Sequence, residues 1–538
     1  MESWDFIIVG AGSAGCVLAN RLSESGRYRV LVLEAGGSDR NFWVRMPIGY
    51  GKTFYHPTLN WRYMSEPVPG LGGRETYWPR GRALGGSSSI NAMVYIRGQH
   101  EDFDSWEALG NSGWGWESVG PIFRRIEDNA SGADDYRGAG GPLSVCDISE
   151  SAHPTCHDFI AACEAVGLPR NADFNGTTQE GAGFYQITTR NGVRASAASA
   201  FLRPAMNRPN LRVVMHAHTT GILFEGRKAV GVKYRLGDRE IKARAMREVI
   251  VSAGAINSPQ LLQLSGIGPT DLCAAHGIPV VKALRAVGEN LQDHLCIDHV
   301  YRANRPTLNS VLRPWWGRVG AGLRYLATRT GPLSLSVNQA GGFCRSDPGR
   351  GRPNLQLYFS PLSYTRAVPG KRQLLLPDQE PGFLLGASNC HPKSRGHVRL
   401  RSRDPFAAPA IQPNYLSARE DVEELIDGSL MLRRISQAGP LAAIIDRELH
   451  PGPSVTSREE IEADLRARSG SVFHPSGTCR MGPDPDVDVV DAQLRVHGVG
   501  GLRVADASIF PLVPSGNINA PTMMTGWKAA SMILADQA

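Results

Sequence analysis

The sequence lacks the patterns that mark several large classes of protein. Its nine cysteines are scattered, and no two of them form a Cys-x-x-Cys pair, which argues against zinc and iron–sulfur sites and against a disulfide framework. No run of five or more like charges occurs, and the formal net charge of +7 is small for 538 residues. We therefore expect no resident metal ion and, without a basic stripe or a reading motif, no nucleic-acid partner.

Long apolar stretches are also missing. No segment approaches 18 uninterrupted apolar residues, so we expect no transmembrane helix. The N-terminal stretch MESWDFIIVG has acidic residues where a signal peptide needs a basic start. We therefore predict a cytoplasmic protein, and contact with the inner face of the membrane and the oligomeric state stay open. With 42% hydrophobic and 20% charged residues, the composition is that of a globular protein of two or three domains.

The first forty residues predict a dinucleotide-binding unit. Apolar runs over residues 6–9 and 28–33 predict two buried parallel strands, and the turn after the first reads Gly10-Ala11-Gly12-Ser13-Ala14-Gly15. In such a turn the first glycine permits the tight bend, the second lets a pyrophosphate approach, and the third lets the helix pack on the strand. Glu34, followed by Ala35, can accept hydrogen bonds from an adenosine ribose and would repel the 2′-phosphate of NADP. The motif alone does not separate FAD from NAD.

Two further segments carry glycine-containing loops. Residues 79–104 include Gly85-Gly86-Ser87-Ser88-Ser89 and then Asn91, a loop on which a flat ring could lie; an ordinary surface loop is the alternative. Residues 254–268 follow an apolar strand at 249–251. There we expect a helix that starts at Ser258-Pro259 and stops at Gly266, and a plain strand–loop–helix unit is the alternative.

Taken together, these segments resemble the glucose–methanol–choline (GMC) family of flavoprotein oxidoreductases. Residues 81–104 resemble its first signature and residues 254–268 its second. The resemblance continues through VGENLQDHL at 287–295 and the C-terminal segment from His474, and it points toward the choline-dehydrogenase-like and bacterial FAD alcohol-dehydrogenase-like members. It implies FAD as the cofactor. Some members bond the flavin covalently through a histidine after the Gly-Gly-Ser run, and because residues 88–92 contain none, we predict non-covalent FAD.

The resemblance implies an α/β fold in which a Rossmann-like FAD-binding domain is interleaved with an α+β substrate domain containing a mostly antiparallel sheet. Residues 355–359, 383–385 and 398–400 show a partial alternation of apolar and polar residues, and we expect them to be strands of a sheet covering the reactive face of the flavin. The expected domain boundaries give the FAD-binding domain residues 1–150, 200–300 and 468–538, and the substrate-binding domain residues 151–199 and 301–467.

The resemblance also implies the catalytic residues, His474 and Asn519. A histidine titrates near neutral pH and can take the hydroxyl proton of an alcohol while a hydride passes to flavin N5, and an asparagine amide can donate a hydrogen bond to the developing alkoxide. Asn519 also has the position of an N-cap for the last helix. Asp506 follows a strand at 502–504 and is expected near the FAD ribityl–pyrophosphate, with an N-cap or turn role as the alternative.

The remaining site predictions form two groups. For the cofactor we expect contacts from Gly10, Gly12, Ser13, Ala14, Gly15, Glu34, Ala35, Arg82, Gly85, Gly86, Ser87, Asn91, Ala92, Met93, Val94, Ala217, Ala253, Gly254, Ser258, Asp506, Ala507, Asn517 and Ile518. For the substrate pocket we expect Tyr358, Phe359 and Phe473, with core packing as the alternative for each.

The predicted reaction is the FAD-dependent oxidation of a primary alcohol, aliphatic or aromatic, to the aldehyde, with electrons passed to a quinone-type or other acceptor. Choline-oxidising relatives carry an acidic residue before a Gly-Phe stretch where this chain has the uncharged Gln339, which favours an uncharged alcohol. Choline dehydrogenase, an oxidase that reduces O2 to H2O2 and, more remotely, a flavin-containing hydroxynitrile lyase stay open as alternatives.

Overall fold

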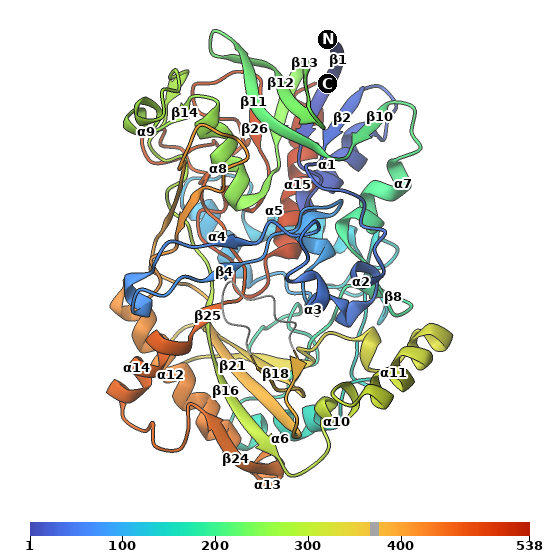
Figure 1. Cartoon of the computed structure of the whole chain (residues 1–538), viewed down its shortest axis with the longest axis vertical. Coiled ribbons are helices and arrows are strands. Elements are labelled where there is room, and N and C mark those ends of the chain that lie inside the picture. The colour runs from blue at the N-terminus through green and yellow to red at the C-terminus, as the bar shows by residue number, and fades with distance from the viewer. Residues whose placement is uncertain (366–375, 538) are drawn as a thin grey trace.

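Two β-sheets, one above the other in Figure 1, organise the chain. The computed structural model describes residues 1–365 and 376–537. Five strands of the upper sheet run parallel in the order β10-β2-β1-β13-β26. The hairpin of β11 and β12 extends this sheet antiparallel to β13. The strands are β1 (Glu2–Val9), β2 (Val30–Leu33), β10 (Leu211–Val214), β11 (Ala217–Glu225), β12 (Lys228–Leu236), β13 (Arg239–Val251) and β26 (Leu502–Val504).

The upper sheet is the predicted Rossmann-like part. The apolar run Phe6–Val9 is fully enclosed because β1 lies between β2 and β13 and is covered by helix α1 (Ser13–Ser23), as expected for a parallel strand. Helix α15 (Asn519–Ala535) lies beside α1 (Figure 1). Their approach requires Gly526, because a Cβ there would come within 2.6 Å of the Ala14 carbonyl oxygen.

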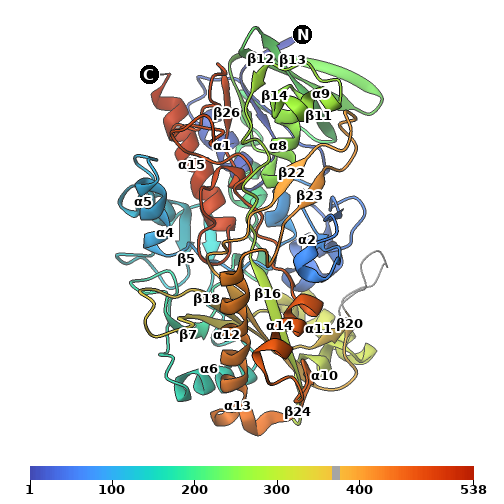
Figure 2. The same ribbon diagram turned by 90° about the vertical axis from the view of Figure 1, so that its left-hand side faces the viewer.

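The lower sheet is antiparallel throughout, in the order β24-β16-β21-β18-β17-β7, with β25 (Gly470–Ser471) beside β16. Helices α6 (Thr155–Ala165) and α12 (Arg419–Ser436) pack on it in the lower half of the molecule (Figure 2). The α/β fold class is thus confirmed. The strands are β7 (Gly181–Phe184), β16 (Leu295–Ala303), β17 (Ala340–Cys344), β18 (Leu355–Ser360), β21 (Gly382–Asn389) and β24 (Ile445–His450).

Two details of the lower half differ from the sequence predictions. The run at 398–400 is not in the lower sheet, because β22 (His397–Arg399) pairs with β23 (Ala410–Gln412) beside helix α8. The lower sheet also includes β25 and residues 295–300 of β16, which fall within the segments expected for the FAD-binding domain, whereas residues 301–303 of β16 fall within the expected substrate-binding domain. The domain boundaries themselves stay a prediction.

Helix α8 (Gly254–Leu264) begins four residues earlier than predicted, so Pro259 lies inside it. A proline cannot donate to the carbonyl four residues before it. The hydroxyl of Thr478 replaces that donor, since its Oγ1 lies 2.6 Å from the Ala255 carbonyl oxygen. Gly266, with a φ of +78°, follows the end of the helix as predicted.

Further helices and short strands lie outside the two large sheets. Within the described residues, no helix is long and apolar enough to cross a membrane. The further helices are α2 (Phe42–Arg45), α3 (Tyr50–Thr53), α4 (His100–Ala108), α5 (Trp116–Ile126), α7 (Arg203–Ala205), α9 (Thr270–Ala275), α10 (Leu308–Leu312), α11 (Trp315–Thr328), α13 (Gly439–Ile444) and α14 (Arg458–Arg468), and the short strands are β3 (Tyr63–Met64), β4 (Tyr77–Trp78), β5 (Glu127–Asn129), β6 (Leu143–Val145), β8 (Thr189–Arg190), β9 (Val193–Arg194), β14 (Ile267–Gly268), β15 (Lys282–Ala283), β19 (Tyr364–Thr365) and β20 (Leu376–Pro377).

Candidate active site

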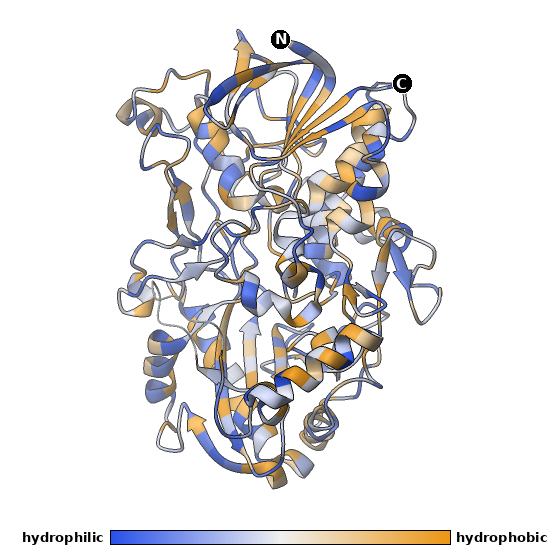
Figure 3. Ribbon diagram, turned by 45° about the vertical axis from the view of Figure 1, so that its right-hand side comes forward, coloured by the Kyte–Doolittle hydropathy of each residue, from blue (hydrophilic) through white to orange (hydrophobic). Residues whose placement is uncertain are grey.

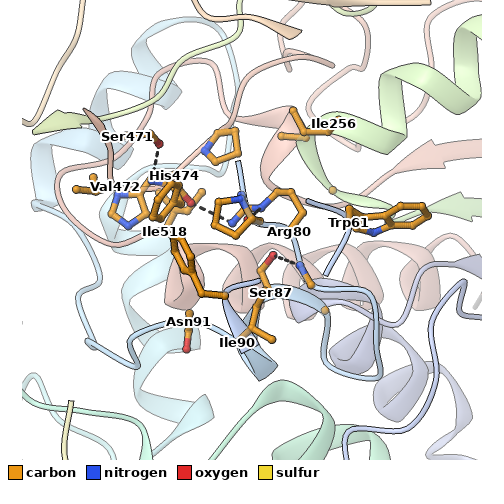
Figure 4. Close-up of a pocket in the computed structure, with 18 of the residues that line it drawn as sticks. Trp61, Arg80, Ser87, Ile90, Asn91, Ile256, Ser471, Val472, His474 and Ile518 are labelled. Atoms are coloured by element: carbon orange, nitrogen blue, oxygen red, sulfur yellow. Dashed lines mark hydrogen bonds between the residues drawn. The ribbon is translucent and has the colours of Figure 1, made fainter. Parts of the chain in front are cut away.

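A cavity of about 980 Å³ lies where the two sheets meet, at the upper end of the volumes of ligand pockets, roughly 300–1,000 Å³. Its wall runs from Glu34 and Ala217, at the carboxyl end of the parallel strands, to Tyr358 and Leu384 of the lower sheet. In open α/β sheets ligands bind at that carboxyl edge. Figure 4 shows part of the wall, with His474 beside Val472 and Ser471.

The glycine turn after β1 has the shape that a dinucleotide requires. Gly10 has a φ of +101°, and a Cβ there would lie 2.4 Å from the Ser252 carbonyl oxygen. Gly12 faces the cavity, and a Cβ on it would meet no protein atom closer than 3.9 Å. No protein atom fills the space beside Gly12, so a bound group can approach the backbone there. This space fits a pyrophosphate.

The Gly-Gly-Ser loop lies directly against this turn. The Gly85 amide donates to the Ala11 carbonyl oxygen at 2.7 Å, and a Cβ on Gly86 would come within 2.8 Å of the Gly12 Cα. The two glycine-rich segments therefore form one continuous floor. Gly15 acts from behind it, because a Cβ there would lie 2.0 Å from the Gly10 carbonyl oxygen.

Glu34 is buried at the carboxyl end of β2, where it lines the cavity. Its carboxylate accepts from the amides of Ala11 at 2.9 Å and Gly36 at 2.7 Å. Burial raises its pKa to about 7, against the opposing effect of these amides. The carboxylate is thus fixed in place, and its remaining lone pairs face the cavity as a ribose site requires.

Three helices begin at the cavity wall. Ser13 of α1, Gly254 of α8 and Asn519 of α15 are each the first residue of their helix, and each lines the cavity. The unpaired amides and positive ends of these helices therefore point at the cavity. Such an arrangement favours an anionic ligand or a ring that gains negative charge.

Asp506 supports one of these helix starts. Its Oδ2 accepts from the Gly254 amide at 2.8 Å and from the Ser258 hydroxyl at 2.6 Å. Its Oδ1 accepts from the Ser508 amide at 2.8 Å, as an N-cap does. Asp506 thus has the N-cap role that the sequence offered as the alternative, and it also lines the cavity. Ser258 donates its hydroxyl hydrogen bond to Asp506.

Hydrogen bonds determine which nitrogen of His474 is free. Nε2 of the buried His294 lies 3.0 Å from the Cys390 carbonyl oxygen, which can only accept, so that nitrogen carries a proton. Burial lowers the pKa of His294 to about 4, so its ring is neutral and its Nδ1 is an acceptor. Nδ1 of His474, 3.0 Å away, must therefore donate to it. This leaves the Nε2 lone pair of His474 as the available base.

The surroundings of His474 keep its ring uncharged. Burial lowers its pKa well below the usual value of 6.5, and the nearby His294 and Arg80 act in the same direction. The backbone amide of His474 donates to Asp293 Oδ1 at 2.6 Å. Oδ2 of Asp293 accepts from the hydroxyls of Ser471 and Tyr415. The base is thus fixed through both its ring and its backbone.

An asparagine amide meets the free nitrogen of His474. Nδ2 of Asn517 lies 3.1 Å from His474 Nε2, and Oδ1 of Asn517 accepts from the Gln356 amide at 3.3 Å. Because Gln356 occupies the oxygen, the Asn517 NH2 group must point toward His474. Asn517 therefore presents a hydrogen-bond donor beside the base.

The structure does not bring Asn519 to His474. Its Oδ1 accepts from the Ser13 hydroxyl at 2.8 Å, so its side chain joins the starts of α15 and α1. Asn519 is the first helical residue, and Ile518 precedes it in the N-cap position. The partner position therefore lies two residues earlier than predicted, because the chain turns into the helix between Asn517 and Asn519.

Most residues predicted for the cofactor share the cavity wall. Arg82 is not part of it, since its guanidinium stacks 4.7 Å from the Trp61 ring centroid, and neither are Gly15, Gly85 and Ser258, which act as described above. The predicted residues that line the cavity are Gly10, Gly12, Ser13, Ala14, Glu34, Ala35, Gly86, Ser87, Asn91, Ala92, Met93, Val94, Ala217, Ala253, Gly254, Asp506, Ala507, Asn517 and Ile518.

The substrate-pocket predictions divide in the same way. Tyr358 and Phe473 line the cavity. Phe359 does not, because neighbouring residues of a strand point to opposite faces, and its ring packs in the core against Phe159 at 4.9 Å. Gln339 is also buried outside the cavity, where its Oε1 accepts from the His153 amide. Its lack of charge therefore says nothing about the substrate.

Some residues at the site had no predicted role. His294 and Asp293 belong to the VGENLQDHL motif, which supported the resemblance without indicating a task. They lie about 180 residues from His474 in sequence, as the separations of 180 and 181 show. The adjacent Asp-His pair in this motif was the available signal, but only the fold shows what the pair contacts.

Comparisons with known proteins agree with this geometry. Two sequence profiles of the family described as GMC oxidoreductase match residues 4–296 and 392–526. The chain is 45% identical to the alcohol dehydrogenase [acceptor] of Pseudomonas putida, over 99% of this chain and 96% of that protein, and 44% identical to mitochondrial choline dehydrogenase of Mus musculus, over 99% and 89%. It superposes on pyridoxine 4-oxidase with a TM-score of 0.88 at 32% identity, and on formate oxidase with 0.91 at 27%, covering 98% or more of every chain.

Proposed function

The chain belongs to the GMC oxidoreductases, FAD-dependent enzymes that act on CH–OH donors, and from this premise we propose that it oxidises a primary alcohol, aliphatic or aromatic, to the aldehyde. One observation carries the proposal. Nε2 of His474, which accepts from Nδ2 of Asn517 and can exchange that partner for a substrate hydroxyl, lies with this amide at a cavity that also contains the glycine turn of β1.

The cavity residues fit FAD. Gly10 and Gly12 leave space for the pyrophosphate, Glu34 has the position to bind the ribose, and the start of α15 lines the cavity beside the start of α1. When bound, FAD would supply an isoalloxazine ring that accepts the hydride from the alcohol carbon. The positive ends of α1 and α15 would stabilise negative charge on a group bound beside them. The absence of a histidine at residues 88–92 supports non-covalent binding.

His474 acts as the base. Its neutral ring accepts the hydroxyl proton at Nε2, while Nδ1–H continues to donate to His294. Nδ1 of His474 is hydrogen-bonded to His294, and His294 is in turn hydrogen-bonded to the Cys390 carbonyl oxygen. These bonds fix the orientation of the His474 ring and hence the direction of its Nε2 lone pair. A base fixed in this way raises the rate through positioning as well as through proton transfer.

Asn517 stabilises the substrate oxygen. Its NH2 group can donate to the alkoxide that forms as the proton leaves, and it cannot titrate. Its hydrogen bond from Gln356 fixes the amide before the substrate arrives. A donor that is already oriented does not need to reorganise during the reaction.

A second candidate is choline. The relatives include choline dehydrogenase, and the cavity wall combines aromatic rings with the carboxylates of Asp298 and Asp378. Aromatic faces and carboxylates are the groups that bind a quaternary ammonium. The ring cluster has centroid separations of 4.9 to 5.4 Å and consists of Phe54, Tyr55, Tyr77 and Phe473.

For the electron acceptor we propose a quinone-type carrier; the name of the Pseudomonas putida relative specifies an acceptor without identifying it. An oxidase is the alternative, and two related structures carry that name. Mixing the reduced enzyme with air-saturated buffer separates them. Slow reoxidation supports the dehydrogenase, and fast reoxidation with release of peroxide contradicts it.

Anaerobic titration of the yellow holoenzyme tests the function itself. The panel contains aliphatic primary alcohols, benzyl alcohol, choline and a cyanohydrin, and the visible absorbance of the flavin is followed. We expect bleaching and formation of the aldehyde with at least one uncharged alcohol. Bleaching by choline alone would favour the second candidate, and cyanohydrin cleavage without bleaching would indicate a lyase.

A further inference from the structure

Helix α11 turns its apolar side to the solvent. Its five large apolar side chains are between 51% and 66% exposed. At roughly 100° per residue they fall in one stripe about 100° wide, while the buried residues Ala321 and Tyr325 lie on the opposite side. Figure 3 shows orange segments on this helix, which projects at the lower right of Figure 1. The five residues are Trp315, Trp316, Val319, Leu323 and Leu326.

Helix α2 carries two further exposed aromatic rings. Phe42 and Trp43 contact each other edge to face at 5.2 Å. Arg45, at the end of α2, influences Tyr325, which lies on the side of α11 opposite the apolar stripe, so these two rings are not counted with the stripe. We call the surface formed by the five apolar residues of α11 the α11 face.

The α11 face is surrounded by positive charge. Between Asp298 and Asp347 the sequence contains no acidic residue. Arg318, Arg324 and Arg329 are exposed beside the apolar stripe. Among the described residues none of the three forms an ion pair with a carboxylate. This surface therefore combines tryptophan, leucine and unneutralised arginine.

We propose that the α11 face seats the enzyme on an anionic lipid bilayer. Tryptophan and leucine on one side of a helix, with arginine at its margins, are the composition of a helix that lies in a membrane interface. Anionic headgroups neutralise the arginines. A second copy of this chain is a poor occupant, because a symmetric contact would bring the same arginines face to face.

This seat also places the lipid next to the candidate site. The turn η5 (Pro332–Ser334) leads from α11 to Val337 and Asn338, which line the cavity. A lipid-soluble alcohol or acceptor could therefore reach the cavity from the bilayer. The membrane contact itself does not depend on which alcohol is oxidised.

Vesicle flotation of the holoenzyme tests the proposal. We expect the enzyme to float with vesicles of phosphatidylethanolamine and phosphatidylglycerol, and far less with phosphatidylcholine alone. The double variant Trp315→Ser, Trp316→Ser should lower the partition coefficient by at least about tenfold, and Arg318→Gln by about fivefold with a weaker salt dependence. Leu323→Ser is compared with the control variant Leu109→Ser. Leu109 is 50% exposed at the end of α4, a helix that Figure 2 shows on the other side of the molecule from α11.

The controls separate this proposal from the catalytic one. Reduction of a water-soluble dye by an alcohol should be unchanged in all four variants, which shows that they are folded. Equal flotation of Leu323→Ser and Leu109→Ser would overturn the proposal. The proposal would also be overturned if the tryptophan double variant bound vesicles as the wild type does but had a different oligomeric state in lipid-free buffer. In that case the α11 face would bind a second copy of the chain.

Discussion

Asn517 and Asn519 are two residues apart, and the geometry assigns them different tasks. Asn517→Ala removes the amide that lies 3.1 Å from His474 Nε2. Loss of one donor to a developing oxyanion slows the chemical step by about 100- to 1,000-fold. Asn519→Ala removes only the acceptor of the Ser13 hydroxyl, 2.8 Å away. A neutral hydrogen bond contributes about 1 kcal/mol, so we expect FAD affinity to fall by about fivefold and flavin reduction to stay near the wild-type rate.

Two measurements separate these effects. Stopped-flow mixing of each FAD-loaded variant with a saturating alcohol gives the rate of flavin bleaching, and equilibrium dialysis gives the dissociation constant for FAD. Asn517→Ala should affect the first and Asn519→Ala the second. If Asn519→Ala slowed bleaching as much as Asn517→Ala, the assignment of the donor to Asn517 would be refuted.

Further predictions concern the groups around the site. His294→Leu removes the acceptor of the His474 Nδ1–H, and we expect flavin reduction by the alcohol to slow by about ten- to a hundredfold. His294→Gln restores an acceptor and should recover part of this rate. Equal rates of flavin reduction in the two variants would contradict this. Glu34→Ala should weaken FAD binding by at least about tenfold without changing reduction of the loaded enzyme, as dialysis and stopped flow report. Since burial holds the pKa of His474 well below 6.5, the rate of flavin reduction should stay level as the pH falls through 6.5 and drop only at lower pH; a drop centred near 6.5 would be inconsistent. Burial lowers the pKa of His299 from 6.5 to about 3, so below pH 6.5 the unfolded chain binds a proton at this residue that the folded chain does not. From pH 6.5 downward the wild type should therefore lose about 1.4 kcal/mol of unfolding free energy per pH unit relative to His299→Gln, as measured by denaturant unfolding at several pH values. An equal pH dependence of the unfolding free energy in the two proteins would exclude this.

The sequence allowed the dinucleotide end of the site to be predicted residue by residue. Gly10, Gly12 and Glu34 lie within one βαβ unit, whose geometry is local and recurs across proteins. The structure accordingly places them on the cavity wall. Gly15 was also correctly expected to permit helix packing, although it does not reach the cavity.

The reacting end could be predicted only in part. The support of His474 by His294 and Asp293 joins segments that are remote in sequence, and no periodicity encodes such a contact. The error at Asn519 arose because a two-residue change of position at a helix start reverses where a side chain points, and sequence reasoning places element boundaries no better than that. Phe359 was misplaced for the related reason that strand register decides which face a residue occupies.

The central claim is that His474 takes the alcohol proton at Nε2. Stopped-flow reduction of His474→Ala tests it most directly, with the FAD content of the variant measured first and His299→Gln, a buried histidine outside the cavity wall, as the control. We expect the variant to retain FAD and to be reduced by alcohol at least about a hundredfold more slowly than the wild type. Reduction of FAD-loaded His474→Ala at a near-normal rate would contradict it.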